Sequence, residues 1–432
     1  MSSSVDLRQS CVGAQPLVGR SLIGEDLFIR MKEIIICESW CRGFEHVEFN
    51  AAFLRTVNLA FPEANLLFLS EQEHGVLVQQ RLQSIANLPI TYGCVPVPQR
   101  GVPNLRQFFT EVRACWQALS LVGRSSAHAL IFTCLRGPSL LAVKALIRPL
   151  GVKIPTVGIV HGELGSLLTK PLRRPWNRVI SLRSVLKWPT PSSLRLIVLG
   201  DSINREVAQL LPAGRHVWRS LEHPYLWSDY EPPSNPTFAQ GRSIRFGFLG
   251  ASSKGLEEFC RIAQIIKSEF PEAIFEMIGF VGNKKPSTEA MKYISGISDS
   301  PLASKEYRKR LEGLTYCLWL GDPKHYRLTA SGTFLDALAS AKPCIALSNS
   351  YLTHYFKVLG DIGYLCESVD EMCACIKGIL KQHPEERYAK QMGNIVRGRN
   401  IFAPDQVARK LRDIFSEMAM PAVEYNVTDN SS

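Results

Sequence analysis

The feature that most constrains the fold of this chain is a repeated alternation of short apolar runs with segments of helical periodicity. Each run is about as long as a strand that is buried on both faces, which is typical of parallel sheets. The runs in the first half are Glu33–Ser39, Asn65–Ser70, Thr91–Val97, Ala129–Leu135, Thr156–Gly162 and Leu194–Gly200. Helical segments lie between most of them, so we expect an α/β protein with helices on both faces of the sheet.

A polar segment rich in proline, residues 231–242, interrupts this alternation and is typical of an interdomain linker. The alternation then restarts, with runs at Ile244–Gly250, Ala273–Phe280, Leu314–Gly321, Pro343–Ser348 and Ile362–Leu365. A chain of 432 residues is long enough for two complete cores. We therefore predict two tandem, doubly wound, Rossmann-like domains, residues 31–230 and 243–403, with ligands bound in the cleft between them.

The rest of the composition is that of a cytoplasmic protein. No run of about 18 uncharged apolar residues occurs, so no transmembrane helix is expected. Residues 1–30 are interpreted as a polar leader without a secretory signal, and residues 421–432 as a flexible tail. Twelve cysteines without a CxxC pair favour reduced thiols over a disulfide framework or a zinc site.

The net charge of +11 is concentrated in the first half, where 25 basic residues in 1–230 face 16 acidic ones. No acidic residue lies between Glu163 and Asp201, and basic residues alternate there with Trp176 and Trp188. This mixture suits the surface of an anionic membrane, at roughly 1 kcal/mol per basic residue. A solvated face is the plain alternative. Nucleic acid is a third, but no recognised nucleic-acid-binding motif is present, so none is expected. We predict peripheral contact with the inner face of a membrane through residues 168–195.

The segment from Tyr326 to Pro343 gives the sharpest functional signal. Ser331, Gly332 and Thr333 form the first turn of a predicted helix, and their small side chains leave its free N–H groups open to an anion. The carboxylate of Asp336, about one turn further on, is placed to bind hydroxyls. Together these groups suit a nucleoside diphosphate attached to a sugar, although an ordinary capped helix with a solvated Asp would have the same sequence.

A second candidate contact follows the first strand of the second domain. Gly250 to Gly255, GASSKG, opens a helix but is neither a Walker A loop nor a GxGxxG motif. Lys254 can still hold a diphosphate as a point charge, and the alternative is a solvent-facing lysine on a tight turn.

The first domain offers candidates at two strand ends. His161 follows the strand at Thr156, where an imidazole can bind a sugar hydroxyl or transfer a proton, unless it is a structural histidine. Gly43 supplies a flexible turn after the first strand, and His46 is a candidate acceptor contact. His223 to Tyr225 are interpreted as shaping the hinge.

Several motifs are absent from the sequence. There is no Asp-x-Asp, GxSxG, HExxH or paired-cysteine motif, so no metal or cofactor is expected. The charge of a diphosphate would then be held by helix N-termini and basic side chains.

Three segments resemble GT-B glycosyltransferases, closest to the retaining family 4. Phe246–Gly255 resembles the family's first strand and basic loop, and Leu328–Ala346 resembles its E-x7-E helix with the strand behind it. Ile159–Glu163 resembles the strand whose histidine faces the donor sugar. The resemblance implies that residues 404–420 form a helix that crosses back onto the first domain.

The resemblance also implies roles for single residues. Asp336 falls on the second Glu of E-x7-E, which binds ribose, and Lys254 falls on the basic diphosphate contact. Leu328 replaces the first Glu, and Ala251-Ser252 replaces an arginine, so the motif is degenerate. Tyr326, Arg327 or His325 are candidates for the missing contacts.

The function expected from these residues is transfer of a sugar from a nucleotide-diphosphate sugar to a lipid-linked or saccharide acceptor, without a metal, in polysaccharide or glycan assembly. A nucleotide-sugar epimerase and a non-catalytic partner in an assembly complex are the alternatives.

Overall fold

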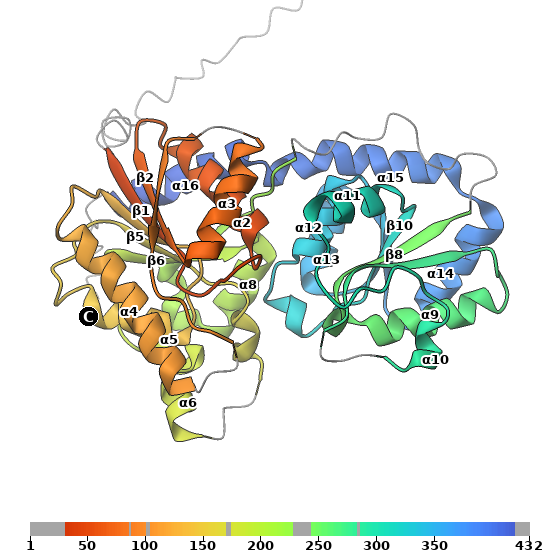
Figure 1. Ribbon diagram of the computed structural model, residues 1–432, viewed down its shortest axis with the longest axis horizontal. Helices are drawn as coiled ribbons and strands as arrows, with labels where there is room; N and C mark the ends of the chain where they lie inside the picture. Colours follow the sequence, from red (N-terminus) through yellow and green to blue (C-terminus); the bar gives the residue numbers. More distant parts are fainter. Residues whose placement is uncertain are drawn as a thin grey trace, which may run out of the picture.

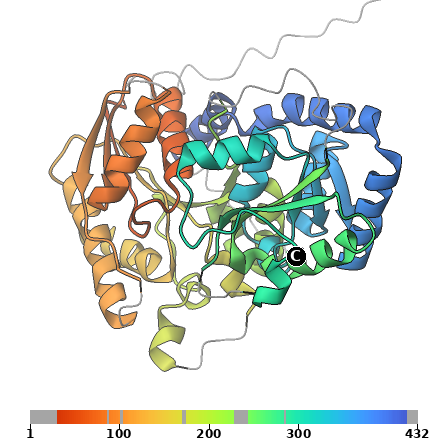
Figure 2. The same cartoon turned by 45° about the vertical axis from the view of Figure 1, so that its right-hand side comes forward.

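The computed structural model describes residues 31–85, 88–100, 104–169, 174–227, 243–282 and 286–419. The predicted leader (1–30), linker (231–242) and tail (421–432) lie outside the described residues. Figure 1 shows two domains side by side, each a sheet covered by helices, and Figure 2 shows the same arrangement turned by 45°. The chain passes from the first domain to the second, and its last helix returns to the first.

The first domain is built on a parallel sheet with the strand order β3-β2-β1-β4-β5-β6-β7. Its strands are β1 (Glu33–Cys37), β2 (Asn65–Ser70), β3 (Ile90–Cys94), β4 (Ala129–Phe132), β5 (Thr156–Ile159), β6 (Leu194–Leu199) and β7 (Trp218–Leu221). Its helices are α2 (Val47–Ala60), α3 (Gln72–Gln83), α4 (Asn104–Val122), α5 (Gly137–Leu146), α6 (Pro175–Val179), α7 (Leu182–Val185) and α8 (Asp201–Leu210). Each predicted run overlaps a strand, whereas the edge strand β7 was not predicted.

The second domain has a smaller parallel sheet with the order β12-β11-β10-β8-β9. Its strands are β8 (Arg245–Ala251), β9 (Ile274–Phe280), β10 (Tyr316–Trp319), β11 (Cys344–Leu347) and β12 (Gly363–Cys366). Its helices are α9 (Leu256–Lys267), α10 (Thr288–Met291), α11 (Ser304–Glu312), α12 (Gly332–Ala339), α13 (Ser350–Leu359), α14 (Val369–Gln382) and α15 (Glu385–Gly398). The predicted architecture, two α/β domains with doubly wound sheets, is confirmed.

Burial on both faces of the central strands explains their unbroken apolar sequences. In β1, residues Ile34 to Cys37 are fully buried, and β4 is fully buried throughout. Each such aliphatic side chain contributes about 1.5–3 kcal/mol to the free energy of folding. The strand order reverses direction at β1/β4 in one sheet and at β8/β10 in the other. Ligands bind at such switch points, outside the carboxyl ends of the strands.

The last helix, α16 (Pro404–Ala419), belongs to the first domain in space. Its apolar face, which includes Leu411 and Phe415, is buried. The Phe415 ring meets Phe61 at the end of α2 edge to face, with 5.3 Å between ring centroids. Figure 1 shows α16 behind α2 and α3, connected through α15 to the second domain. In the described part of the chain, no helix has both the length and the apolar character needed to cross a bilayer.

Candidate functional site

A cleft of about 520 Å³ lies between the two domains. The first domain contributes the segments that follow β1, β5 and β7. The second contributes the segments that follow β8 and β9, together with α11 and the start of α12. Of the predicted site residues, the cleft lining includes His46, His161, Gly250, Lys254, Tyr326, Gly332, Thr333 and Asp336. The structure thus brings together residues that are nearly 300 positions apart in the sequence.

The N-terminus of α12 opens into this cleft. The Ser331 side chain caps the helix by accepting a hydrogen bond from the Phe334 N–H at 3.3 Å, and it also accepts one from Trp319 Nε1 at 3.0 Å. Ser331 is fully buried and is not part of the cleft lining, so its hydroxyl fixes the helix end rather than contacting a ligand. Gly332 is exposed, and a Cβ there would meet nothing within 4 Å. A ligand can therefore approach the free N–H groups of the first turn.

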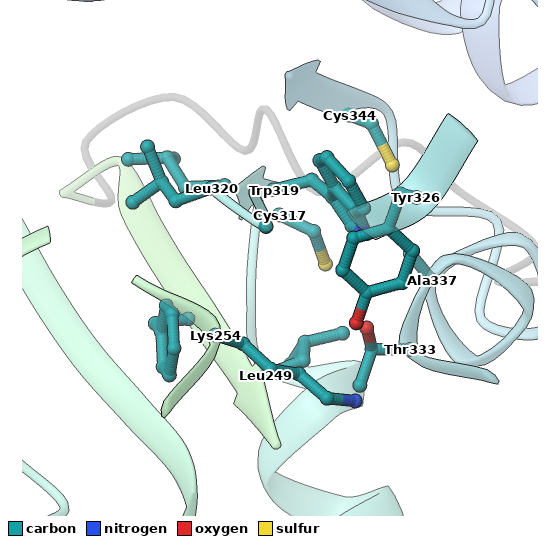
Figure 3. A pocket seen from close by; sticks show the side chains of 12 residues that line it. Leu249, Lys254, Cys317, Trp319, Leu320, Tyr326, Thr333, Ala337 and Cys344 are labelled. Atoms are coloured by element: carbon teal, nitrogen blue, oxygen red, sulfur yellow. The ribbon is translucent and has the colours of Figure 1, made fainter. Parts of the chain in front are cut away.

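Gly250 allows the loop after β8 to approach α12 closely. Its φ of 94° is in the left-handed region, and a Cβ would lie 2.9 Å from Thr333 Cγ2 and 3.3 Å from Lys254 Nζ. Figure 3 shows the amine of Lys254 pointing toward Thr333, beside the Tyr326 hydroxyl. Burial lowers the pKa of Lys254, and the nearby Asp336 carboxylate acts in the opposite direction. A poorly solvated cation beside a helix N-terminus is a site where a bound anion gains strong electrostatic stabilisation.

Asp336 is held by two tyrosines from different domains. Its Oδ1 accepts a hydrogen bond of 2.6 Å from the Tyr225 hydroxyl, and its Oδ2 accepts one of 2.9 Å from the Tyr307 hydroxyl. Burial raises the pKa of Asp336 to about 6, although both hydrogen bonds and Lys254 act to lower it. Each carboxylate oxygen keeps a second lone pair, so the group remains able to accept a hydrogen bond from a ligand hydroxyl.

Three histidines surround Phe49 on the first-domain side of the cleft. The ring centroids of His46 and His161 are 4.6 Å apart, and Phe49 lies 5.2 Å from His161 and 4.9 Å from His223. Burial lowers the pKa of all three, to about 4 for His223 and well below the usual value for His161. At neutral pH they are uncharged imidazoles, each with one donor and one acceptor nitrogen. His161 Nε2 is buried and has no hydrogen-bond partner within the described structure.

Sequence reasoning missed several residues of the cleft. The Thr329 side chain lies beside the start of α12, and its Oγ1 is buried without a partner among the described residues. Tyr307 was missed because no motif marks α11. The rings of Phe44 and Phe280 meet edge to face across the cleft, with 6.3 Å between their centroids. No motif marks Thr329, and its buried hydroxyl becomes evident only in the folded protein.

Two predicted contacts have other partners. Arg327 is not part of the cleft lining, and its Nε donates to Glu206 Oε2 on α8 at 2.7 Å, which ties the two domains together. Gly43 also lies outside the lining. Its φ is 49°, and its carbonyl oxygen lies 2.8 Å from His74 Nδ1. Gly43 therefore shapes the turn just before residues 44–46, which line the cleft. Leu328 is fully buried, so the position offers no polar group.

Among the described residues, one group of metal-ligating side chains clusters within 4.8 Å, namely Glu38, Cys41 and Cys134. The Glu38 carboxylate already accepts four hydrogen bonds, from Trp40 N, Cys41 N, Asn50 Nδ2 and Thr133 Oγ1. A hydrogen bond to Cys134, together with burial, raises the pKa of the Cys41 thiol. A saturated carboxylate and protonated thiols fit a structural network below the loop after β1 better than a metal site.

Comparison with known proteins yields structural relatives only. No protein-family model and no curated protein matches the sequence. HepE from Anabaena in complex with UDP is similar to this chain with a TM-score of 0.60 and 10% identity, over 90% of this chain and 100% of that one. A glycosyltransferase from Rickettsia africae gives 0.61 and 11%, over 90% and 98%. WaaG, a glycosyltransferase involved in lipopolysaccharide biosynthesis, gives 0.57 and 12%, over 88% and 99%. The chain therefore has the two-domain GT-B fold of glycosyltransferases.

Proposed function

We propose that the protein is a glycosyltransferase that uses a nucleoside-diphosphate sugar as donor. The observation that most strongly supports this proposal is the position of Lys254 beside the open N-terminus of α12, with Asp336 one turn along the helix, inside a cleft between two domains. Structures of HepE have been determined with UDP and with UDP-glucose, which supports a donor of this class.

Each part of the proposed donor has a matching group. The diphosphate binds the N–H groups of Gly332 and Thr333 and the ammonium group of Lys254, and Asp336 accepts hydrogen bonds from the ribose. As the glycosidic bond breaks, negative charge grows on the leaving diphosphate. The helix end and Lys254 are already oriented toward that charge, so they lower the barrier by electrostatic stabilisation without a metal.

The donor sugar would lie between the domains, against His161 and Thr329. Each of these side chains has a buried polar atom without a partner in the described structure, and leaving such a group unsatisfied costs about 1–3 kcal/mol. Sugar hydroxyls supply both donors and acceptors, so they would satisfy both atoms. Because the histidines are uncharged at neutral pH, this part of the cleft suits a neutral sugar better than an anionic one.

The finer parts of the proposal rest on the family 4 resemblance and on charge. We propose retention of the anomeric configuration, a lipid-linked or saccharide acceptor bound by the first domain, a role in glycan assembly, and peripheral contact with an anionic membrane through residues 168–195. The degenerate E-x7-E motif favours one alternative, a non-catalytic partner that binds a nucleotide sugar, since Leu328 is fully buried and cannot contact the sugar.

Nucleotide release tests the proposal. The full chain is incubated with UDP-, GDP-, ADP- and dTDP-linked sugars and with membrane extracts or oligosaccharides as acceptors. We expect one donor to release its nucleoside diphosphate when an acceptor is present, and the anomeric configuration of the product, read by NMR, tests retention. Donor binding without any turnover would instead support the non-catalytic alternative.

A further inference from the structure

The helix α4 has an apolar stripe on its solvent side. Leu105, Phe109 and Trp116 have the spacing i, i+4, i+11, which places them on one face of a helix, and Val112 between them is partly buried against the core. Leu105, Phe109 and Trp116 are 51%, 60% and 45% exposed. The side of α4 that packs on the sheet is a different one, formed mainly by small residues from Ala114 to Leu119. Contiguous exposed apolar surface of this kind marks an interaction site in soluble proteins.

The short helix α6 extends this apolar surface. Trp176 and Val179 are 41% and 50% exposed, and the Trp176 ring meets Phe108 of α4 edge to face with centroids 5.2 Å apart. The start of α4 also bonds to α6, from Asn104 Nδ2 to Asn177 Oδ1 at 3.3 Å. Residues 104–116 and 174–179 therefore form one surface, called here the α4–α6 face, on the lower side of the first domain in Figure 1.

The charge around this face has one sign. From residue 74 to residue 200 the sequence contains 16 Lys and Arg but only two acidic residues, Glu111 and Glu163. Both carboxylates pair with the same Arg136, at 3.2 and 3.5 Å. The α4–α6 face itself carries four exposed arginines, at positions 106, 113, 174 and 178, and its one carboxylate, Glu111, is buried.

The structure separates the basic side chains of the stretch 168–195 into engaged and exposed groups. Within 168–195, Arg183 donates to the carbonyl oxygens of Leu167 and Thr169, and Arg195 donates to those of Ser192 and Leu194. These guanidinium groups are already engaged with the protein, and Lys170 and Arg173 lie outside the described residues. Arg174, Arg178 and Lys187 remain exposed in this stretch, and the two arginines belong to the α4–α6 face.

We infer that the α4–α6 face docks on an anionic phospholipid membrane. Exposed aromatic rings suit the headgroup level of a bilayer, and exposed aliphatic side chains suit the boundary with the acyl chains. The surrounding arginines then contact the lipid phosphates. Leu105 and Val179, which would gain nothing from a polyanion, argue against nucleic acid as the occupant.

Arg100, four positions before the start of α4 in the sequence, pairs with Glu45 of the cleft lining at 2.5 Å. Arg100 and Arg136 also lie on the Trp40 ring, 3.9 and 3.4 Å from its centroid. The consequence for catalysis, unlike the docking itself, rests on the proposed transferase function. If that function holds, docking places an acceptor that is anchored in the membrane beside the first-domain side of the cleft.

Vesicle sedimentation with the full chain tests the inference, using phosphatidylcholine vesicles with and without phosphatidylglycerol. Two variants probe the face, Phe109→Ser with Trp116→Ser, and Arg106→Ala with Arg113→Ala. Matched controls in the second domain change exposed residues of the same two kinds, Ile265→Ser with Val358→Ser, and Arg261→Ala with Lys390→Ala.

We expect the wild-type protein and both controls to bind only vesicles that contain phosphatidylglycerol. Loss of the two arginines should lower the partition coefficient by roughly 30-fold, about fivefold for each cation, and loss of the two rings by at least about tenfold. Equal binding of face variants and controls would overturn the inference. So would binding of RNA or DNA through these arginines without vesicle binding. Titration with UDP, GDP, ADP and dTDP without vesicles separates the two claims, because failure of all four would remove the proposed function and leave the docking surface intact.

Discussion

The Tyr225 hydroxyl, at the end of the first domain, donates a 2.6 Å hydrogen bond to Asp336 Oδ1 in the second domain. The backbone of Tyr225 is fixed as well, because its N–H donates to the Phe402 carbonyl oxygen at 2.9 Å. The carboxylate proposed to bind ribose therefore also connects the two domains, so the position of one domain relative to the other affects the donor site directly.

Replacing Tyr225 by Phe should weaken this connection. A hydrogen bond to a charged group is worth about 1.5–3 kcal/mol, so the free energy of unfolding should fall by roughly that amount. Tyr307→Phe removes a similar bond from the same carboxylate within one domain and is the matched control. The rate of backbone amide hydrogen exchange at the interface between the two domains should increase in Tyr225→Phe but not in Tyr307→Phe. Equal increases in both variants would contradict the interdomain role.

The raised pKa of Asp336 predicts a specific dependence of stability on pH. Its value of about 6 in the folded protein lies above the ordinary 3.8, so between these values the folded state binds more protons than the unfolded state. The contribution of Asp336 to stability is then full below about pH 4 and falls as the pH rises to 6, by up to about 3 kcal/mol. Urea denaturation at several pH values, compared with Asp336→Asn, should show this loss in the wild type only. Parallel curves for the two proteins would disprove it.

The strands were predictable because burial on both faces leaves a continuous apolar sequence. β7 was not, since the polar residues Arg219 and Ser220 make up half of its four residues, so no continuous apolar run marks it. Gly250, Lys254 and the first turn of α12 were found from local patterns, because a strand, a tight turn and a helix N-terminus are encoded by neighbouring residues.

The pairing of groups across the cleft could not be read from the sequence. The bond between Tyr225 and Asp336 joins residues 111 positions apart, and nothing in either local pattern indicates the other. Likewise, the ion pair with Glu206 gives Arg327 a role that its position next to Tyr326 does not reveal. Contacts of this kind depend on how the domains meet.

Thr329→Val should separate recognition of the sugar from recognition of the nucleotide. The substitution keeps the shape of the side chain and removes the buried hydroxyl that has no partner in the described structure. We expect the Kd for the nucleoside diphosphate to stay unchanged and that for the nucleotide sugar to rise about fivefold or more. Thr353→Val, at an exposed position on α13, serves as the control. If both ligands bind the variant as tightly as the wild type, Thr329 does not contact the sugar.

His161→Ala should lower kcat/KM by about 10- to 100-fold, because a buried neutral imidazole in the cleft is lost. The Kd of the nucleoside diphosphate should not change, since the diphosphate is proposed to bind the other domain. His128→Ala provides the comparison, since His128 precedes β4 and lies at the opposite end of the strands. Full activity of His161→Ala would exclude His161 from the reaction.

The most direct test of the donor site is calorimetric titration of the full chain with UDP, GDP, ADP and dTDP, repeated with Lys254→Ala and with Lys267→Ala. We expect one nucleoside diphosphate to bind the wild type and the Lys267→Ala control equally well. Lys254→Ala should bind it at least about tenfold more weakly, because a charged contact to the diphosphate is lost. If no nucleoside diphosphate binds, or if Lys254→Ala binds as tightly as the control, the cleft is not a donor site of the kind described.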